Sequence, residues 1–94
     1  GLKRHGHDGT FVYAIRPVSG GLTKIGIADD PVRRIRHLQS MAPVPMQLVD
    51  LVHGSRADEI AYHRQYHGLR AHGEWFALGD NRNPLGQCPL WRPR

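Results

Sequence analysis

The chain has 94 residues, a formal net charge of +5 and 7 histidines in addition. This length suits one small domain whose core is thin. No apolar run approaches the roughly 20 residues that a membrane span requires, so we expect no membrane partner. The one cysteine, Cys88, cannot form an internal disulfide, which favours a reducing, intracellular (cytoplasmic) setting.

Positive charge gathers in several short stretches of the chain. Lysine and arginine occur mainly at 3–4, 33–36, 64–70 and 92–94. A small basic domain commonly binds polyanions, so the charge favours nucleic acid as a partner over a role in solubility alone.

The first third of the chain predicts an arm and a hairpin. Residues 1–10 are polar and rich in glycine and histidine, and we expect them to form a flexible arm. The β-branched and aromatic run 11–15 predicts a strand. Turn-forming residues follow at 17–21, and the run 22–27 predicts the returning strand.

The register of this hairpin brings two polar side chains together. A tight turn centred after Val18 would pair Ile15 with Leu22. The same register places Tyr13 opposite Lys24, and directly opposed residues share one face of a sheet. We therefore expect Tyr13 and Lys24 to lie side by side.

The next segment predicts a helix from Pro31 to about Ser40. Asp30 is suited to the N-cap and proline to the first helical position. The helix is expected to bury an apolar stripe of Val32, Ile35 and Leu38.

Helical spacing separates the basic residues of this helix. Arg34 falls at the edge of the apolar stripe, beside Leu38, and is expected to reach across the sheet. Arg33 and His37 fall on the opposite, solvent-facing side.

The run 46–52 predicts a third strand, buried on both faces in its middle. Ser55 and Asp58 form a capping-box pattern, which predicts a second helix over 56–67. The side expected to face inward carries Tyr62, Glu59, Tyr66, His63, Ile60 and His67. A carboxylate on such a side requires a metal ion or a positive side chain nearby, which makes Glu59 a candidate site residue.

The expected fold is of the α/β (α+β) class. It has a small three-stranded antiparallel sheet flanked by helices, in the order strand, strand, helix, strand, helix. The apolar cluster 73–78 adds a short C-terminal element that closes the core. We expect the domain to span 11–78 and the Pro- and Gly-rich residues 79–94 to form an irregular tail.

Several short motifs occur in a characteristic order. They are Phe11-Val12-Tyr13, Lys24-Ile25-Gly26, Arg34 with Leu38, Glu59 through His63, and Gly73-Glu74-Trp75-Phe76. This order resembles the GIY-YIG nuclease superfamily, and it is most similar to the small phage-type branch, which is associated with phages or mobile elements. The first motif keeps only the tyrosine of the family signature, and Lys24 stands where most of the superfamily has a second tyrosine.

The resemblance implies a metal-dependent endonuclease that hydrolyses DNA phosphodiester bonds. Tyr13 would act as the general base or orient the attacking water, and the cation at Lys24 would favour the phenolate. Arg34 would bind the scissile phosphate. Glu59 would be the protein ligand of a single Mg²⁺ or Mn²⁺. His63 lies one helical turn after Glu59 and would assist proton transfer or fix Tyr13.

Other basic side chains on the two helices are expected to contact DNA around this site. They are Arg33, Arg36, His37 and Arg64. Since so small a domain has little surface for reading bases, an additional DNA-reading domain in a longer chain is also expected.

Two alternatives stay open at this point. The chain could be a catalytically inactive GIY-YIG-like module that only binds DNA. It could instead be a zinc-binding protein that uses Glu59, His63 and His67, with His5 and His7 as further ligands, because histidines one turn apart on a helix bind Zn²⁺. The sequence leaves the oligomeric state undetermined.

Overall fold

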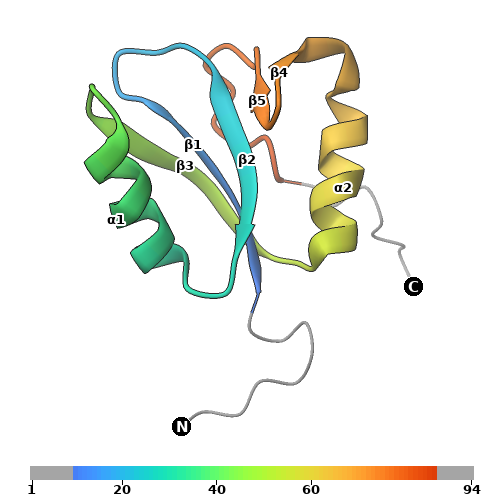
Figure 1. The fold of residues 1–94 in the computed structure, drawn as a ribbon. Helices are drawn as coiled ribbons and strands as arrows, with labels where there is room; N and C mark the ends of the chain where they lie inside the picture. The colour runs from blue at the N-terminus through green and yellow to red at the C-terminus, as the bar shows by residue number, and fades with distance from the viewer. Residues whose placement is uncertain (1–9, 87–94) are drawn as a thin grey trace, which may run out of the picture.

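A computed structural model describes residues 10–86 (Figure 1). The elements in chain order are β1 (Phe11–Pro17), β2 (Thr23–Ala28), α1 (Pro31–Met41), β3 (Met46–His53), α2 (Arg56–Gln65), the 3-10 helix η2 (His67–Leu69), β4 (Arg70–His72) and β5 (Trp75–Phe76). Apart from Thr10, the expected N-terminal arm lies outside the described residues, as do His5, His7, Cys88 and the end of the expected tail.

Within residues 10–86 the strands form one antiparallel sheet of five strands in the order β3-β1-β2-β5-β4. The expected α+β class is confirmed, whereas the expected three-stranded sheet is wrong. Residues 70–76 fold into a β4–β5 hairpin around Gly73, whose φ is +54°. We expected a short element over 73–78 and no strand over 70–72. This hairpin extends the sheet beyond β2, because β5 pairs with Thr23 and Lys24.

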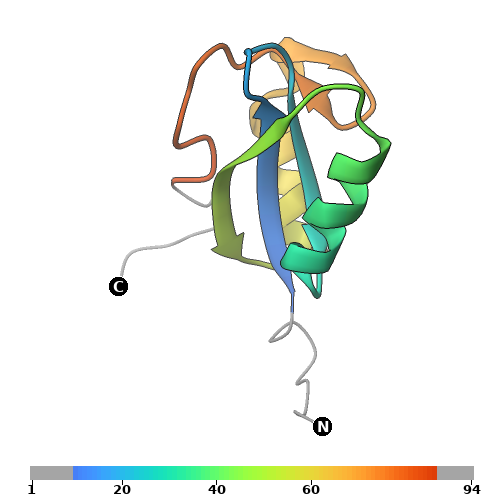
Figure 2. The ribbon, with the colours of Figure 1, turned by 90° about the vertical axis from the view of Figure 1, so that its left-hand side faces the viewer.

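The two helices cover opposite faces of the sheet (Figures 1 and 2). Successive residues of a strand point to opposite faces, so β1 contributes to two cores. On the α2 side the core consists of Val12, Ala14, Ile25, Tyr62, Phe76, Leu78 and Leu85. On the α1 side it consists of Tyr13, Ile15 and Ala28, against which Ile35, Leu38 and Met46 pack.

The register of the β1–β2 hairpin differs from the expected one by two residues. Ile15 pairs with Lys24, and Tyr13 pairs with Gly26. The loop is wider than a two-residue turn, since β1 ends at Pro17 and β2 begins at Thr23, and within it Gly20 and Gly21 adopt positive φ angles of 97° and 126°. A shift by an even number of residues preserves the face of every side chain. Tyr13 and Lys24 therefore still share one face, as diagonal rather than direct neighbours.

Strand β3 occupies an edge of the sheet rather than its middle (Figure 2). The expectation that its centre is buried on both faces is wrong, since Leu48 is 45% exposed. A register shift also interrupts the β1–β3 ladder, where Ala14 pairs with Asp50 and Ile15 with Leu48. The local apolar pattern could not distinguish an edge strand from a central one.

The helices begin where the sequence predicts. The Asp30 side chain accepts a hydrogen bond from the Arg33 amide at 3.1 Å, and Ser55 with Asp58 forms the capping box of α2. Helix α2 ends at Gln65, earlier than expected, and Val32 of the expected α1 stripe is exposed. Among the described residues no helix has the length and apolar character needed to cross a membrane.

Residues 77–86 contain no helix or strand, yet they pack onto the α2 side of the sheet. Leu85 is 1% exposed, and its carbonyl accepts a hydrogen bond from the Tyr62 hydroxyl at 3.2 Å. Its amide donates to the Asp50 carboxylate of β3 at 2.9 Å. The core therefore continues past Leu78, where we expected the domain to end.

Candidate active site

Tyr13, Lys24 and Gly26 meet on the α1 face of the sheet. Tyr13 is fully buried, at 0% exposure. The Lys24 ammonium lies 5.4 Å from the centre of the Tyr13 ring, and its Nζ donates a hydrogen bond to the Tyr13 hydroxyl at 3.3 Å. The expected proximity of Tyr13 and Lys24 is thus present, although the two residues are diagonal rather than direct partners in the ladder.

Lys24 also forms an ion pair with Glu74, the residue directly before β5. Burial by itself lowers the pKa of Lys24, but the hydrogen bond and charge of Glu74, together with Tyr13, outweigh it and raise that pKa. Burial likewise favours the protonated form of Glu74, yet the bond to Lys24 holds the pKa of this carboxyl below its usual value. Both side chains are therefore ionised at neutral pH.

Glu59 lies in the first turn of α2 with its carboxylate facing the sheet. It is 2% exposed, and its Oε2 has no hydrogen-bond partner among the described residues. Its Oε1 lies 3.9 Å from the Arg56 guanidinium. Burial, and then the nearby charge of Glu74, raise the pKa of Glu59, against the opposing effect of His63 and Arg56. A buried carboxylate oxygen without a donor is a position that a cation would satisfy.

His63 follows Glu59 by one helical turn, so both side chains project from the same side of α2. Its Nε2 lies 2.9 Å from the Ile25 carbonyl of β2, which accepts the ring proton. Its ring packs against Phe76, with 5.1 Å between the ring centres. These contacts fix the orientation of the imidazole and occupy Nε2 rather than Nδ1.

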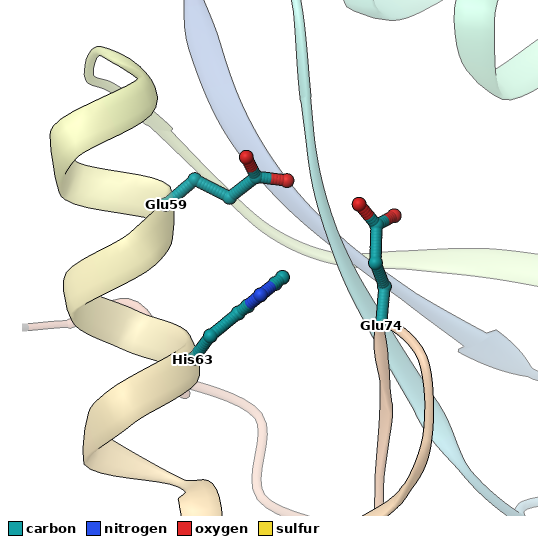
Figure 3. Close-up of side chains that lie close together, drawn as sticks. All are labelled: Glu59, His63 and Glu74. Carbon is teal, nitrogen blue, oxygen red and sulfur yellow. The ribbon is translucent and has the colours of Figure 1, made fainter.

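Glu59, His63 and Glu74 converge from α2 and from the turn before β5 (Figure 3). Each offers one ligand atom, and these atoms lie within 4.8 Å of one another. Carboxylates and imidazoles are common protein ligands of divalent cations, and the unpartnered oxygen of Glu59 fits such an ion. The sequence predicts Glu59 as the sole protein ligand and does not single out Glu74. The sequence feature that could have indicated Glu74 is its position directly before Trp75 and Phe76, which were expected in the core.

The sheet topology explains how side chains from the α1 face and from the α2 face of the sheet approach the same edge of β2. Strand β5 pairs only with Thr23 and Lys24, so among the described residues no strand pairs with 26–28 on that side of β2. The Ile25 amide donates a hydrogen bond to the Glu74 carbonyl at 3.0 Å, and the Ile25 carbonyl is met by His63 of α2 rather than by a strand. At this open edge, Lys24 reaches from the α1 face toward Glu74.

The basic residues of α1 lie at the far end of β2. Arg33, Arg34 and His37 line one hollow together with Ala28, Asp29 and Asp30. Ala28 shares the α1 face of β2 with Gly26, so the hollow continues the surface beside Tyr13. The expected separation of Arg34 from Arg33 and His37 is not seen, since long side chains of neighbouring turns reach the same hollow.

The other predicted residues lie at the surface. Arg36 and Arg64 are exposed. His67 is exposed in η2, beyond the end of α2, and it does not belong to the cluster of Glu59, His63 and Glu74. In the alternative zinc set of Glu59, His63 and His67, the structure thus brings together the first two residues but not His67, because the helix ends before it.

The sequence matches the family described as the T5orf172 domain over residues 10–86. Searches of curated proteins and of solved structures gave no significant match. The matched range coincides with the part of the chain that forms the sheet, both helices and the packed segment that ends with Leu85.

Proposed function

The chain belongs to the T5orf172 domain family, and we propose that it is a metal-dependent endonuclease that hydrolyses DNA through a GIY-YIG-type site. One observation carries the proposal. A buried tyrosine bonded to a lysine, and a buried glutamate with an unpartnered oxygen, approach the same open edge of β2. An aliphatic core does not require these groups, whereas phosphodiester hydrolysis uses each of them.

Tyr13 is the proposed general base. Its oxygen takes a proton from water, the water oxygen bonds to phosphorus, and the bond from phosphorus to the 3′ oxygen breaks. The departing 3′ oxygen takes a proton from a solvent water molecule, and Tyr13 returns its proton to solvent, so the products carry 5′-phosphate and 3′-hydroxyl ends. Lys24 donates to the Tyr13 oxygen, so its charge stabilises the phenolate that accepts the proton.

Glu59, with His63 and Glu74 within reach, would hold the divalent ion. Bound there, Mg²⁺ or Mn²⁺ supplies positive charge that stabilises the pentacovalent phosphate and the leaving oxygen. The hydrogen bond to the Ile25 carbonyl keeps the His63 ring in place, and Glu59 is positioned by the capped first turn of α2.

Arg34 is the proposed ligand of the scissile phosphate, because it lines the hollow that continues the surface beside Tyr13. Arg33 and His37 line the same hollow and would contact neighbouring phosphates, as would the exposed Arg36 and Arg64. The net charge of +5 supports a polyanionic substrate.

One observation favours a second candidate, a module that binds DNA without cutting it. Tyr13 is 0% exposed, so its hydroxyl lies beneath Lys24 in this conformation. A base in that position acts only if the overlying side chains move.

The deciding experiment is nicking of supercoiled plasmid with Mg²⁺, Mn²⁺, Zn²⁺ or EDTA by wild-type protein and by Glu59→Gln. Asp80→Asn, which removes one exposed carboxylate elsewhere, serves as the matched control. We expect Mg²⁺- or Mn²⁺-dependent nicking that Glu59→Gln abolishes and Asp80→Asn retains. Salt-sensitive DNA binding without nicking under any metal would instead support the binding module.

A further inference from the structure

The Lys24–Glu74 ion pair covers the Tyr13 hydroxyl. Tyr13 is fully buried, whereas the side chains of Lys24 and Glu74 are 14% and 43% exposed. The Lys24 ammonium bonds to both the Tyr13 oxygen and the Glu74 carboxylate. Glu74 thus draws Lys24 into the position in which it lies over the base.

Glu74 also belongs to the cluster on the other side of the β2 edge. One of its oxygens lies within 4.8 Å of ligand atoms of Glu59 and His63 (Figure 3). Glu59 is buried there with an unpartnered oxygen, which marks the space between the three residues as a cation position. The Glu74 carboxylate therefore has two competing positive partners, the Lys24 ammonium and a divalent ion.

We propose that Glu74 is a metal ligand shared with Lys24, and that divalent-ion binding loosens the Lys24–Glu74 pair and uncovers Tyr13. This inference rests on the proposed function. When the Glu74 carboxylate binds a divalent ion, its attraction for the Lys24 ammonium becomes weaker. The coupling is reciprocal, so the Lys24 ammonium in turn lowers the affinity of the site for the ion. Once released from Glu74, the Lys24 ammonium can shift to the side of the Tyr13 oxygen and admit water to it.

Metal binding without DNA tests the ligand assignment. Calorimetric titration with Mn²⁺ should give an affinity that falls roughly tenfold or more in Glu74→Gln and rises roughly fivefold or more in Lys24→Met. Asp80→Asn and Arg82→Met remove the same charges at exposed positions outside the cluster and should leave the affinity unchanged. Thermal melts by circular dichroism verify that each variant is folded.

Nitration by tetranitromethane, located by peptide mass spectrometry, tests the uncovering of Tyr13. Nitration of Tyr13 should rise when Mg²⁺ is added to the wild-type protein, and Glu74→Gln should show the raised level without metal. Tyr62, which is 1% exposed in the opposite core, is the internal reference.

The outcomes separate this inference from the proposed function. Mn²⁺ affinity lost in Glu59→Gln but unchanged in Glu74→Gln would overturn the shared ligand and leave the nuclease proposal standing. Lys24→Met binding no tighter than wild type, or Tyr13 nitration insensitive to Mg²⁺, would overturn the coupling. A wild-type protein that binds no Mn²⁺ would overturn both proposals.

Discussion

The Tyr13 ring lies across Gly26, its direct partner in the β1–β2 ladder. A Cβ atom placed on Gly26 would come within 2.5 Å of the Tyr13 hydroxyl oxygen and 2.6 Å of Cζ. It would also lie 3.1 Å from Nζ of Lys24. The absence of a side chain at position 26 therefore makes the space in which the tyrosine and lysine meet.

We predict that Gly26→Ala displaces Tyr13 and lowers both stability and cleavage. Distances below 3 Å cannot be kept, and the ring is enclosed by the core, so overpacking should destabilise the fold by about 1–3 kcal/mol. Plasmid nicking should fall by roughly two orders of magnitude, because the base leaves its position.

Gly68→Ala is the matched control for this variant. A Cβ at Gly68 would meet nothing within 4 Å, so melting temperature and nicking should stay at wild-type values. A Gly26→Ala protein with wild-type stability and activity would show that Tyr13 does not depend on this space.

Tyr13→Phe removes the proposed base and keeps the ring. Loss of general-base catalysis typically reduces the rate by about 10²–10⁴-fold, and we expect a loss of kcat in that range. The core-facing ring is retained, so the variant should fold, as measured by circular dichroism. Wild-type kcat in this variant would exclude Tyr13 as the base.

Glu59→Gln should separate stability from activity. The raised pKa of Glu59, caused first by burial and then by Glu74, means that the folded protein disfavours its ionised form. The neutral isostere should therefore stabilise the metal-free protein at pH 7 by roughly 1 kcal/mol, or about 4–8 °C in Tm for a domain of this size, while nicking is lost.

The pH dependence of this gain has a defined sign. A carboxyl whose pKa is higher in the folded than in the unfolded state stabilises the fold below the unfolded value of 4.5, and that contribution is lost as pH rises through the folded-state pKa. The advantage of Glu59→Gln over wild type should thus shrink as pH falls from 7 toward 4.5. Melting curves in EDTA measure it, and a variant less stable than wild type at pH 7 would contradict the prediction.

Arg34 and Arg36 should differ in what they contribute. Both side chains are exposed, but Arg34 lines the hollow beside the site and Arg36 does not. Arg34→Ala should lower kcat by about 10²-fold or more. Arg36→Ala should mainly weaken DNA binding and reduce the slope of log affinity against log salt by about 1. Single-turnover cleavage and salt titration distinguish the two effects. Equal kcat values for Arg34→Ala and Arg36→Ala would show that Arg34 does not bind the scissile phosphate.

Leu85 should be as important for stability as a residue of a regular strand. It is 1% exposed within the α2-side core, so Leu85→Ala should destabilise the fold by about 2–5 kcal/mol. Leu69, which is 48% exposed, is the matched control, and its alanine variant should change stability by less than about 0.5 kcal/mol. Equal losses of stability for Leu85→Ala and Leu69→Ala in denaturant melts would show that the segment 77–86 is not part of the core.

The sequence alone predicted the features that depend on neighbouring residues. The Asp30-Pro31 pair and the Ser55–Asp58 capping box located both helix starts, because caps satisfy nearby backbone amides. Helical spacing placed Glu59 and His63 on one side of α2. Strand alternation kept Tyr13 and Lys24 on one face although the hairpin register was wrong by two residues, since only an odd shift changes the face.

Tertiary structure decided what no local pattern encodes. The edge position of β3 and the addition of β5 beside β2 depend on pairing between strands distant in sequence. That pairing brings Glu74 to Lys24, 50 residues away, and within reach of Glu59 and His63. Residue types and helical spacing thus determined which side chains were suited to chemistry, but only the closing of the sheet, driven by burial of the core, decided which of them meet.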